Sequence, residues 1–320
     1  MLYDVIRPCP DRSVFFGYGP VFLDFRNFLR YIGKVKPECC SGGQNMEYRL
    51  LALDMDGTLL KSDKTISPVT GNAIREAMGN GIAVTLSTGR NYAELADYPE
   101  LMAMLKYGIL NSGAVIWDFQ KGCPVAMKLL EPEKIRRVMK AAMAYDTMIH
   151  IHTVDHTYAL REQMERMAEY HMAVYQPLFR KSCEPVTDIV RCAEEHINET
   201  AKICIYFTEN GPRELLRKEL DDGTLELVYS EATSLEVTTP GVTKAYGLEM
   251  LCSRLEINPE QTVAVGDADN DLEILKVAGL AVAMGNANER VKACCDIITD
   301  DNDHDGIASL IRKYLTGPET

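Results

Sequence analysis

The chain has no run of apolar residues that approaches the length of a membrane-spanning helix. Such a helix needs roughly 18 consecutive apolar residues, and none of the 320 residues lies in a run of that kind. The chain also has no excess of basic residues, because its formal net charge is −13. This charge argues against nucleic acid or an anionic membrane surface as the main partner. We therefore expect no nucleic-acid partner and no membrane partner.

The sequence has no Cys-x-x-Cys pair, although it contains ten cysteines. The cysteines are scattered, with two adjacent pairs at Cys39-Cys40 and Cys294-Cys295. This pattern is typical of free thiols in a reducing compartment and not of a disulfide framework or a structural zinc site. We therefore expect a cytoplasmic protein.

Two aspartates stand two residues apart at the end of an apolar run. Residues 50–53 are apolar, and Asp54 and Asp56 follow them. Side chains at i and i+2 leave the end of a strand on the same side. Gly57 permits a tight turn, and Thr58 adds a hydroxyl group. Because two like charges so close need a bound cation or a proton between them, the motif predicts a site for a divalent cation and a phosphate group.

Two further apolar runs end in polar residues. Residues 82–86 lead into Ser-Thr-Gly-Arg at 87–90, and residues 262–265 lead into Gly-Asp-Ala-Asp-Asn-Asp at 266–271. Between them, Lys244 stands at the start of a predicted helix. Short apolar runs that alternate with helices indicate parallel strands. Ligands of open parallel sheets bind beyond the carboxyl ends of the strands, so we expect these polar groups to converge on one site.

In this order, the four segments resemble the motifs of the haloacid dehalogenase-like (HAD) superfamily of phosphohydrolases. They are more narrowly similar to its Cof-type branch (subfamily IIB, C2-type cap), from about Met46 to the C-terminus. The resemblance implies an α/β fold, with a Rossmann-like parallel-sheet core and an inserted α+β cap. We expect residues 46–128 and 239–320 to form the core and residues 129–238 to form the cap. Alternating apolar patterns in the cap predict a mainly antiparallel sheet.

Residues 1–45 lie outside this resemblance and lack the basic-then-apolar layout of a signal peptide. One hypothesis is that they are translated from a misassigned start, with Met46 as the natural first residue. The alternative is a genuine N-terminal extension that packs on the core or mediates association. The sequence gives no indication of the oligomeric state.

The resemblance implies a role for each acidic motif residue. Asp54 would be the nucleophile that attacks phosphorus and forms an aspartyl-phosphate. Asp56 would protonate the leaving oxygen and then activate the water that hydrolyses this intermediate. Mg²⁺ would be bound by the Asp54 carboxylate, the Asp56 backbone carbonyl and Asp267. Asp271 would orient the waters of the metal from outside its ligand set.

The resemblance also implies a group of phosphate-binding residues. Thr88 and Gly89 would contact the phosphoryl oxygens, Lys244 would offset their negative charge, and Asn270 would donate a hydrogen bond. We interpret Arg90 as a structural residue that pairs elsewhere on the core.

The leading functional hypothesis is a Mg²⁺-dependent phosphatase that hydrolyses a small phosphorylated metabolite, such as a sugar phosphate or a cofactor phosphate. A phosphotransferase or phosphomutase with the same intermediate is one alternative, and a non-catalytic binding protein on this scaffold is another. An Asp at position 56, where the ATPase pumps of the family have Thr, favours a hydrolase. Cap loops near residues 153–157 and 180–188 would set the specificity.

Three other patterns have simpler interpretations. His150, His152 and His156 suggest a strand face or substrate contacts and not zinc, because no acidic or thiol partner is evident nearby. Residues 301–306 begin like a calcium loop, but the twelfth position is Arg312, so we predict an acidic turn that caps the last helix. The methionines and tyrosines of residues 163–175 could line a substrate pocket, but their spacing also fits an ordinary packed helix, which we favour.

Overall fold

The structure, a computed structural model, describes residues 15–16 and 48–316. The hypotheses on the origin of residues 1–45 therefore lie almost entirely outside the described residues. Within the part of the chain that is described, no helix is long and apolar enough to cross a membrane.

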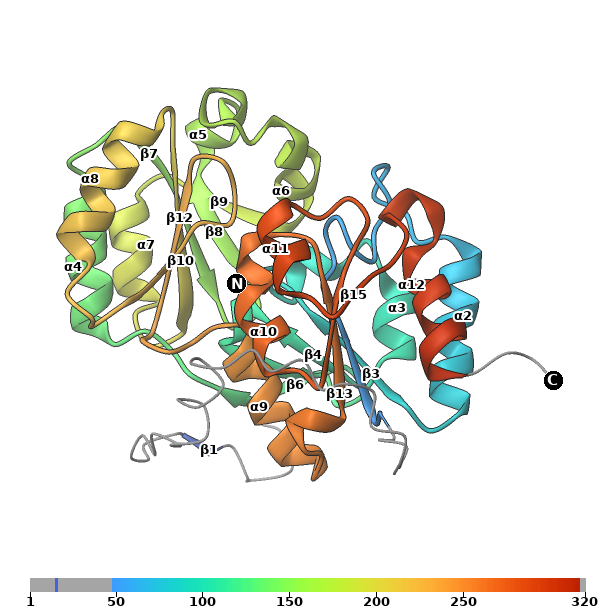
Figure 1. The fold of residues 1–320 in the computed structure, drawn as a ribbon. Coiled ribbons are helices and arrows are strands. Elements are labelled where there is room, and N and C mark those ends of the chain that lie inside the picture. Colours follow the sequence, from blue (N-terminus) through green and yellow to red (C-terminus); the bar gives the residue numbers. More distant parts are fainter. Residues whose placement is uncertain (1–14, 17–47, 317–320) are drawn as a thin grey trace.

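A nine-stranded sheet forms the centre of the larger part of the molecule (Figure 1). Its strand order is β1-β6-β5-β4-β3-β2-β13-β14-β15, and β5 pairs antiparallel with both β4 and β6 while the other pairs are parallel. The central strands are apolar and buried along their whole length, as expected for a parallel sheet with both faces covered. The strands are β1 (Phe15–Phe16), β2 (Leu50–Leu53), β3 (Ala83–Ser87), β4 (Tyr107–Leu110), β5 (Val115–Asp118), β6 (Cys123–Met127), β13 (Thr262–Gly266), β14 (Leu280–Ala283) and β15 (Ile297–Ile298).

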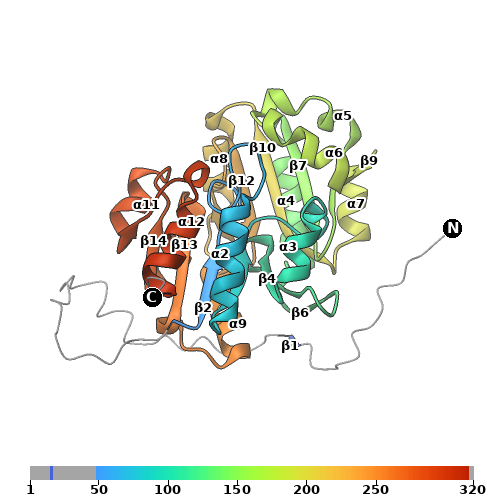
Figure 2. The same ribbon diagram turned by 90° about the vertical axis from the view of Figure 1, so that its right-hand side faces the viewer.

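Helices cover both faces of this sheet (Figures 1 and 2). Helix α2 packs beside α12 on one face, and α9 packs beside α10 on the other. Ser67 caps α2 by accepting a hydrogen bond from the backbone N–H of Thr70, and Pro68 is its first residue, a position that favours proline. The helices are α2 (Pro68–Gly79), α3 (Pro99–Met104), α9 (Lys244–Leu255), α10 (Leu272–Val277), α11 (Glu289–Cys294) and α12 (Gly306–Leu310).

A second sheet, of six strands, has the order β11-β12-β10-β7-β8-β9. Only the β8–β9 pair is parallel among these strands, so the expected mainly antiparallel sheet is confirmed. Three helices pack on one face, and a chain of short helical segments packs on the other. We propose that this sheet and its helices form the cap, with the boundaries at residues 129 and 238. The strands are β7 (Thr147–Thr153), β8 (Thr157–Leu160), β9 (Cys183–Val186), β10 (Thr200–Phe207), β11 (Glu226–Val228) and β12 (Ser234–Thr238). The helical elements are α4 (Pro132–Ala142), α7 (Ile189–Glu195) and α8 (Asn210–Leu220) on the first face, and α5 (Arg161–Met164), η3 (Met167–Tyr170), η4 (Ala173–Tyr175) and α6 (Gln176–Ser182) on the second.

Two predictions about local structure are wrong. Residues 163–175 do not form one packed helix, because the chain turns at His171, which has a φ of 60°, and continues in short segments. The acidic turn at 301–306 does not cap α12 with a side chain. Asp301 instead accepts hydrogen bonds from the N–H groups of the short helix η7 (Asn302–His304), and Asp305 accepts one from the Ser67 hydroxyl at the start of α2. The acids of this turn therefore hold neighbouring segments of the core.

Candidate active site

Three carboxyl groups meet at the carboxyl ends of β2 and β13. Asp54, Asp267 and Asp271 each place one carboxylate oxygen within 4.8 Å of the others. They come together because β2 and β13 are parallel neighbours, so the residues that follow them reach the same edge. Lys244, the first residue of α9, donates hydrogen bonds to Asp54 Oδ1 (2.6 Å) and Asp271 Oδ1 (2.7 Å). The convergence expected from the sequence is therefore present.

Burial dominates the electrostatics of this cluster. It raises the pKa of Asp54 well above its usual range, although the charge of Lys244 opposes the shift. Burial and the neighbouring charge of Asp271 raise the pKa of Asp267 to about 6. Burial alone would lower the pKa of Lys244, but Asp271 and Asp54 together raise it. Three carboxyl groups around one ammonium group leave the cluster short of positive charge, and their hard oxygen atoms suit a cation such as Mg²⁺.

The neighbours of Asp267 fix its orientation. Thr58 Oγ1 donates a hydrogen bond to Asp267 Oδ1 over 2.9 Å. Gly57 passes so close that a Cβ atom there would lie 2.5 Å from Asp267 Oδ2, and its φ of +81° also favours glycine. Asp271 Oδ2 accepts hydrogen bonds from the backbone N–H groups of Asp267 and Ala268. Asp271 is therefore committed to Lys244 and to this turn.

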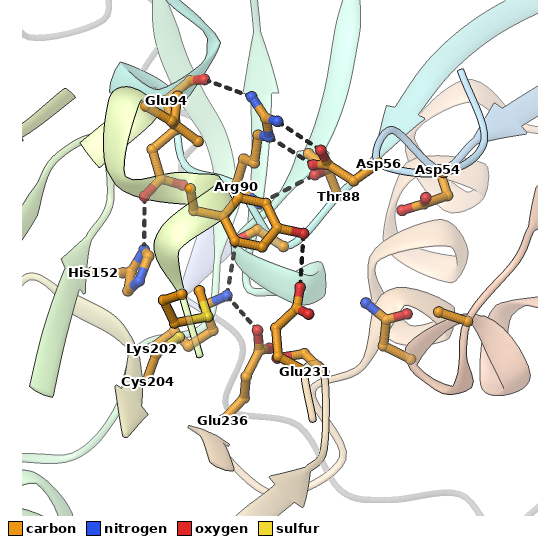
Figure 3. Close-up of a pocket in the computed structure, with 18 of the residues that line it drawn as sticks. Asp54, Asp56, Thr88, Arg90, Glu94, His152, Lys202, Cys204, Glu231 and Glu236 are labelled. Carbon is orange, nitrogen blue, oxygen red and sulfur yellow. Dashed lines mark hydrogen bonds and ion pairs between the residues drawn. The ribbon is translucent and has the colours of Figure 1, made fainter. Parts of the chain in front are cut away.

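The side chain of Asp56 lies apart from the three-carboxylate cluster and faces Arg90 (Figure 3). Arg90 Nε and Nη2 donate to the two carboxylate oxygens, both over 2.8 Å, and Lys64 Nζ donates to Oδ1 over 2.8 Å. Burial acts to raise the pKa of Asp56, but Arg90 and then Lys64 outweigh it and lower the pKa. Our interpretation of Arg90 was therefore wrong, because it pairs with Asp56 itself. The adjacency of β2 and β3, whose ends carry these two residues, is the signal that could have found the pair.

A cavity of about 360 Å³ lies above these groups. Of the residues predicted from the sequence, Asp54, Asp56, Asp267 and the phosphate-binding candidates Thr88, Gly89 and Asn270 all line it. Lys244 reaches the same place through its hydrogen bond to Asp54. The predicted site residues thus surround one space.

The second sheet supplies the opposite wall of the cavity, so it lies over the carboxyl ends of β2 and β3. Residues 153–157 and 180–188, all of which the structure describes, do not line the cavity. The prediction that these loops set the specificity is therefore wrong. The wall comes instead from strand faces, from the segment 172–179 and from the loop before β12. Its residues are His152, Met172, Tyr175, Leu178, Phe179, Lys202, Cys204, Tyr206, Ser230, Glu231 and Glu236. The period-2 spacing of Lys202, Cys204 and Tyr206 on β10 is a signal that could have identified part of it.

The histidines hold no metal cluster. Among the described residues, Asp54, Asp267 and Asp271 form the only group of His, Cys, Asp and Glu side chains arranged to hold an ion. An acidic neighbour does exist, contrary to expectation, since Glu94 of the core lies 3.7 Å from His152 Nδ1. His152 lines the cavity, whereas His156 pairs with Asp155 on the half-buried turn before β8.

Comparisons with known proteins agree with this geometry. Residues 51–311 match the family of haloacid dehalogenase-like hydrolases. The chain is 31% identical over 273 residues to the 5-amino-6-(5-phospho-D-ribitylamino)uracil phosphatase YcsE of Bacillus subtilis, covering 85% of this chain and 98% of that protein. It is 26% identical over 280 residues to the pyridoxal phosphate phosphatase YbhA of Escherichia coli, and the match covers 84% of this chain and 100% of that protein.

Solved structures give the same assignment. A haloacid dehalogenase-like hydrolase from B. subtilis superimposes with a TM-score of 0.75 at 26% identity, covering 83% of this chain and 100% of that chain. The fold also matches that of the HAD subclass IIB sugar phosphatase BT4131, with a TM-score of 0.69 at 22% identity over 82% of this chain and 97% of that chain. The chain therefore belongs to the haloacid dehalogenase-like hydrolases, and within them to the Cof-type branch.

Proposed function

We propose that this protein is a Mg²⁺-dependent phosphatase that hydrolyses small phosphomonoesters through an aspartyl-phosphate on Asp54. The observation that carries the proposal is the buried cluster of Asp54, Asp267 and Asp271 around Lys244, at the base of a cavity of about 360 Å³. Pockets of this size suit metabolites and not polymers.

Among the described residues, one cation holds the nucleophile. Lys244 bonds Asp54 Oδ1, which leaves Oδ2 as the oxygen that attacks phosphorus. Thr88, Gly89 and Asn270 bind the phosphoryl oxygens. Asp54, Asp267 and the Asp56 backbone carbonyl would hold Mg²⁺, which supplies positive charge for the phosphoryl group in transit.

Asp56 serves as the acid and base of the reaction. In the pair with Arg90 and Lys64 its carboxylate is ionised and directed to the side of the cavity. We infer that, when a substrate fills the cavity, Asp56 takes up a proton from solvent and gives it to the leaving oxygen. The carboxylate then removes a proton from the water that attacks the aspartyl-phosphate. Arg90 stabilises the ionised form between turnovers.

The relatives support a small metabolite as the substrate. Their names assign them a ribitylaminouracil phosphate and pyridoxal phosphate, both phosphomonoesters. We take from them the class of substrate for this chain. A cytoplasmic location is part of the same proposal, because the described cysteines include the free thiols Cys183, Cys192, Cys204, Cys252, Cys294 and Cys295.

The decisive experiment measures phosphate release from a panel of phosphomonoesters, with Mg²⁺ and with a chelator, for the wild type and Asp54→Asn. We expect turnover that requires Mg²⁺ and that falls roughly 10³-fold or more in the variant, as for loss of a catalytic nucleophile. Asp269→Asn is the matched control, since this acid sits in the turn that carries Asp267 and Asp271 but pairs with Arg290 outside the cavity. Full activity in Asp54→Asn would contradict the proposal. Phosphate release that needs a second phosphorylated compound would favour the phosphotransferase alternative.

A further inference from the structure

The cations that line the cavity are already engaged with carboxylates. They are Lys64, Arg90 and Lys202. Lys64 and Arg90 both bond Asp56. Lys202 of β10 is buried and donates to three acceptors, namely Gly89 O (2.8 Å), Ser112 Oγ (3.3 Å) and Glu236 Oε1 (3.1 Å). An ammonium group has three protons, so Lys202 has none left for a ligand.

Glu231, by contrast, is a carboxyl group without a cation. It lines the cavity, and its Oε1 accepts a hydrogen bond from the Tyr175 hydroxyl over 2.8 Å. No ion pair of Glu231 occurs within residues 48–316. Figure 3 shows it beside Glu236, whose charge is matched by Lys202. The cap wall therefore carries one negatively charged hydrogen-bond acceptor that forms no ion pair among the described residues.

The hydrogen-bond network around His152 makes its second nitrogen an acceptor as well. Thr157 Oγ1 accepts a hydrogen bond from Asn91 Nδ2 (2.6 Å) and donates one to Glu94 Oε1 (2.8 Å). This hydroxyl can only accept from His152 Nδ1, which lies 3.2 Å away. Nδ1 therefore carries the proton, and Nε2 carries a lone pair. Nε2 is buried and has no hydrogen-bond partner among the described residues.

Much of the remaining wall is apolar or aromatic. Met172, Phe179 and Tyr206 line the cavity and are almost completely buried. Together with the Tyr175 ring, they offer flat and apolar surfaces to the part of a ligand that lies beyond the phosphate. A flexible chain of hydroxyl groups would leave these surfaces unmatched.

We propose that the cap wall selects phosphomonoesters whose leaving group is neutral or cationic, carries an N–H or O–H donor and has a flat apolar part. Glu231 and His152 Nε2 accept hydrogen bonds from this donor, and the aromatic side chains pack on the flat part. Anionic leaving groups and sugar bisphosphates are disfavoured, because the wall has no cation to receive a second negative charge. This inference rests on the proposed phosphatase activity and names the substrate class of the same site.

The test uses aryl phosphates that share one flat ring. 4-(Aminomethyl)phenyl phosphate and 4-carboxyphenyl phosphate differ in the charge at the far end of the ring. We expect the wild type to prefer the amine in kcat/KM by about tenfold or more, the size of a hydrogen bond to a charged group. Glu231→Gln should reduce this preference about tenfold, through KM of the amine. Comparing the ratio between variants cancels the intrinsic reactivity of the two esters. Glu184→Gln, an exposed carboxylate of β9 outside the cavity, should leave the ratio unchanged.

The role of His152 is tested with 4-(hydroxymethyl)phenyl phosphate against 4-methylphenyl phosphate. The wild type should prefer the hydroxyl compound by roughly fivefold or more, and His152→Leu should abolish this preference. His152→Gln should restore part of it, because the Gln amide oxygen can take the position of Nε2. A structural role alone would lower the activity on both esters equally in both variants.

The outcomes separate this inference from the proposed function. If no phosphomonoester is hydrolysed by the folded protein, the proposed function fails and the inference fails with it. If metabolite phosphates are hydrolysed but the aryl esters are not, or if the carboxylate ester is used as well as the amine, only the inference is overturned. Preference for the amine that survives in Glu231→Gln would overturn the assignment of Glu231.

Discussion

Removing the charge of Lys202 tests how a buried ion pair joins the two sheets. Lys202 of β10 donates a hydrogen bond to Glu236 of β12, which belongs to the same second sheet. It also donates hydrogen bonds to Gly89 and Ser112 of the core. The side chains of Lys202 and Glu236 are only 2% and 9% exposed. Lys202→Met keeps most of the length of the side chain and leaves the carboxylate of Glu236 buried without a cation. Breaking such a pair costs about 3–5 kcal/mol, and we expect this loss in the free energy of unfolding.

The double variant separates the pair from its surroundings. Glu236→Leu alone should also cost about 3–5 kcal/mol, because it leaves the ammonium unpaired. In Lys202→Met with Glu236→Leu no buried charge remains, but the Gly89 carbonyl loses its donor, at a cost of about 1–3 kcal/mol. The double variant should therefore lose about 3 kcal/mol or more less unfolding free energy than the two single variants lose in sum. Urea unfolding measures all three values. Arg136→Met, which breaks an exposed pair with Glu194, is the control and should cost no more than about 1 kcal/mol.

The pH dependence of the unfolding free energy tests the same ion pair. In the wild type, burial would raise the pKa of Glu236, but Lys202 outweighs it and lowers the pKa, so the contribution of this carboxylate is lost only below its usual pKa of about 4.3. In Lys202→Met the charge that lowers the pKa of Glu236 is gone, and burial, opposed by the hydrogen bond from Ser112, raises this pKa. Protonation of Glu236 then removes the buried charge. The loss in unfolding free energy caused by Lys202→Met should therefore shrink as the pH falls from about 8 towards about 5. A cost under about 1 kcal/mol, or additive single variants, would refute the reasoning.

Three further changes test other parts of the structure. His150→Leu removes a buried imidazole with both nitrogens unpartnered among the described residues, so it should raise the unfolding free energy by about 1 kcal/mol or more in a thermal melt; a clear loss would contradict this. Gly113→Ala should cost roughly 2–4 kcal/mol and displace Lys244, because its φ is +103° and a Cβ would lie 1.9 Å from the carbonyl oxygen that precedes α9. Gly211→Ala, which meets nothing within 4 Å, should leave stability within about 0.5 kcal/mol as its control. Thr58→Val should weaken Mg²⁺ affinity roughly tenfold in a titration, since it removes the donor that orients Asp267; unchanged affinity would mean that this hydrogen bond does not position the ligand.

The site residues at the strand ends could be predicted because their positions follow from local patterns. Asp54, Thr88 and Asp267 each follow a short apolar run, and parallel strands bring such positions to one edge. The start of α2 could be predicted for the same reason, because Ser67 and Pro68 act within a single turn. Each of these predictions needs only the alternation of a strand or the cap of a helix.

The cap wall could not be predicted in this way, because its contacts join distant parts of the chain. Lys202 bonds a residue 113 positions away and Ser112 bonds Glu236 across 124 positions. The loops that sequence reasoning selected lie next to β7, β8 and β9, yet they do not line the cavity. Polar loops are frequent places for specificity, but here the strand faces and the segment 172–179 point at the core. Only the register between the two sheets decides this, and no local pattern encodes it.

His150 and His152 show where local reasoning ends. Both lie on β7, two residues apart, so they share one face of the strand, and both are buried. His150 packs against the rings of Phe179 and Tyr206, and its nitrogens have no partner within the described residues. His152 lies beside Thr157 and Glu94, which fix its proton on Nδ1 and direct the chemistry of Nε2. Two identical side chains with the same periodicity thus differ in their surroundings, because Thr157 and Glu94 lie beside His152 and not beside His150. Glu94 stands 58 residues before His152 in the chain, so no local pattern shows this contact.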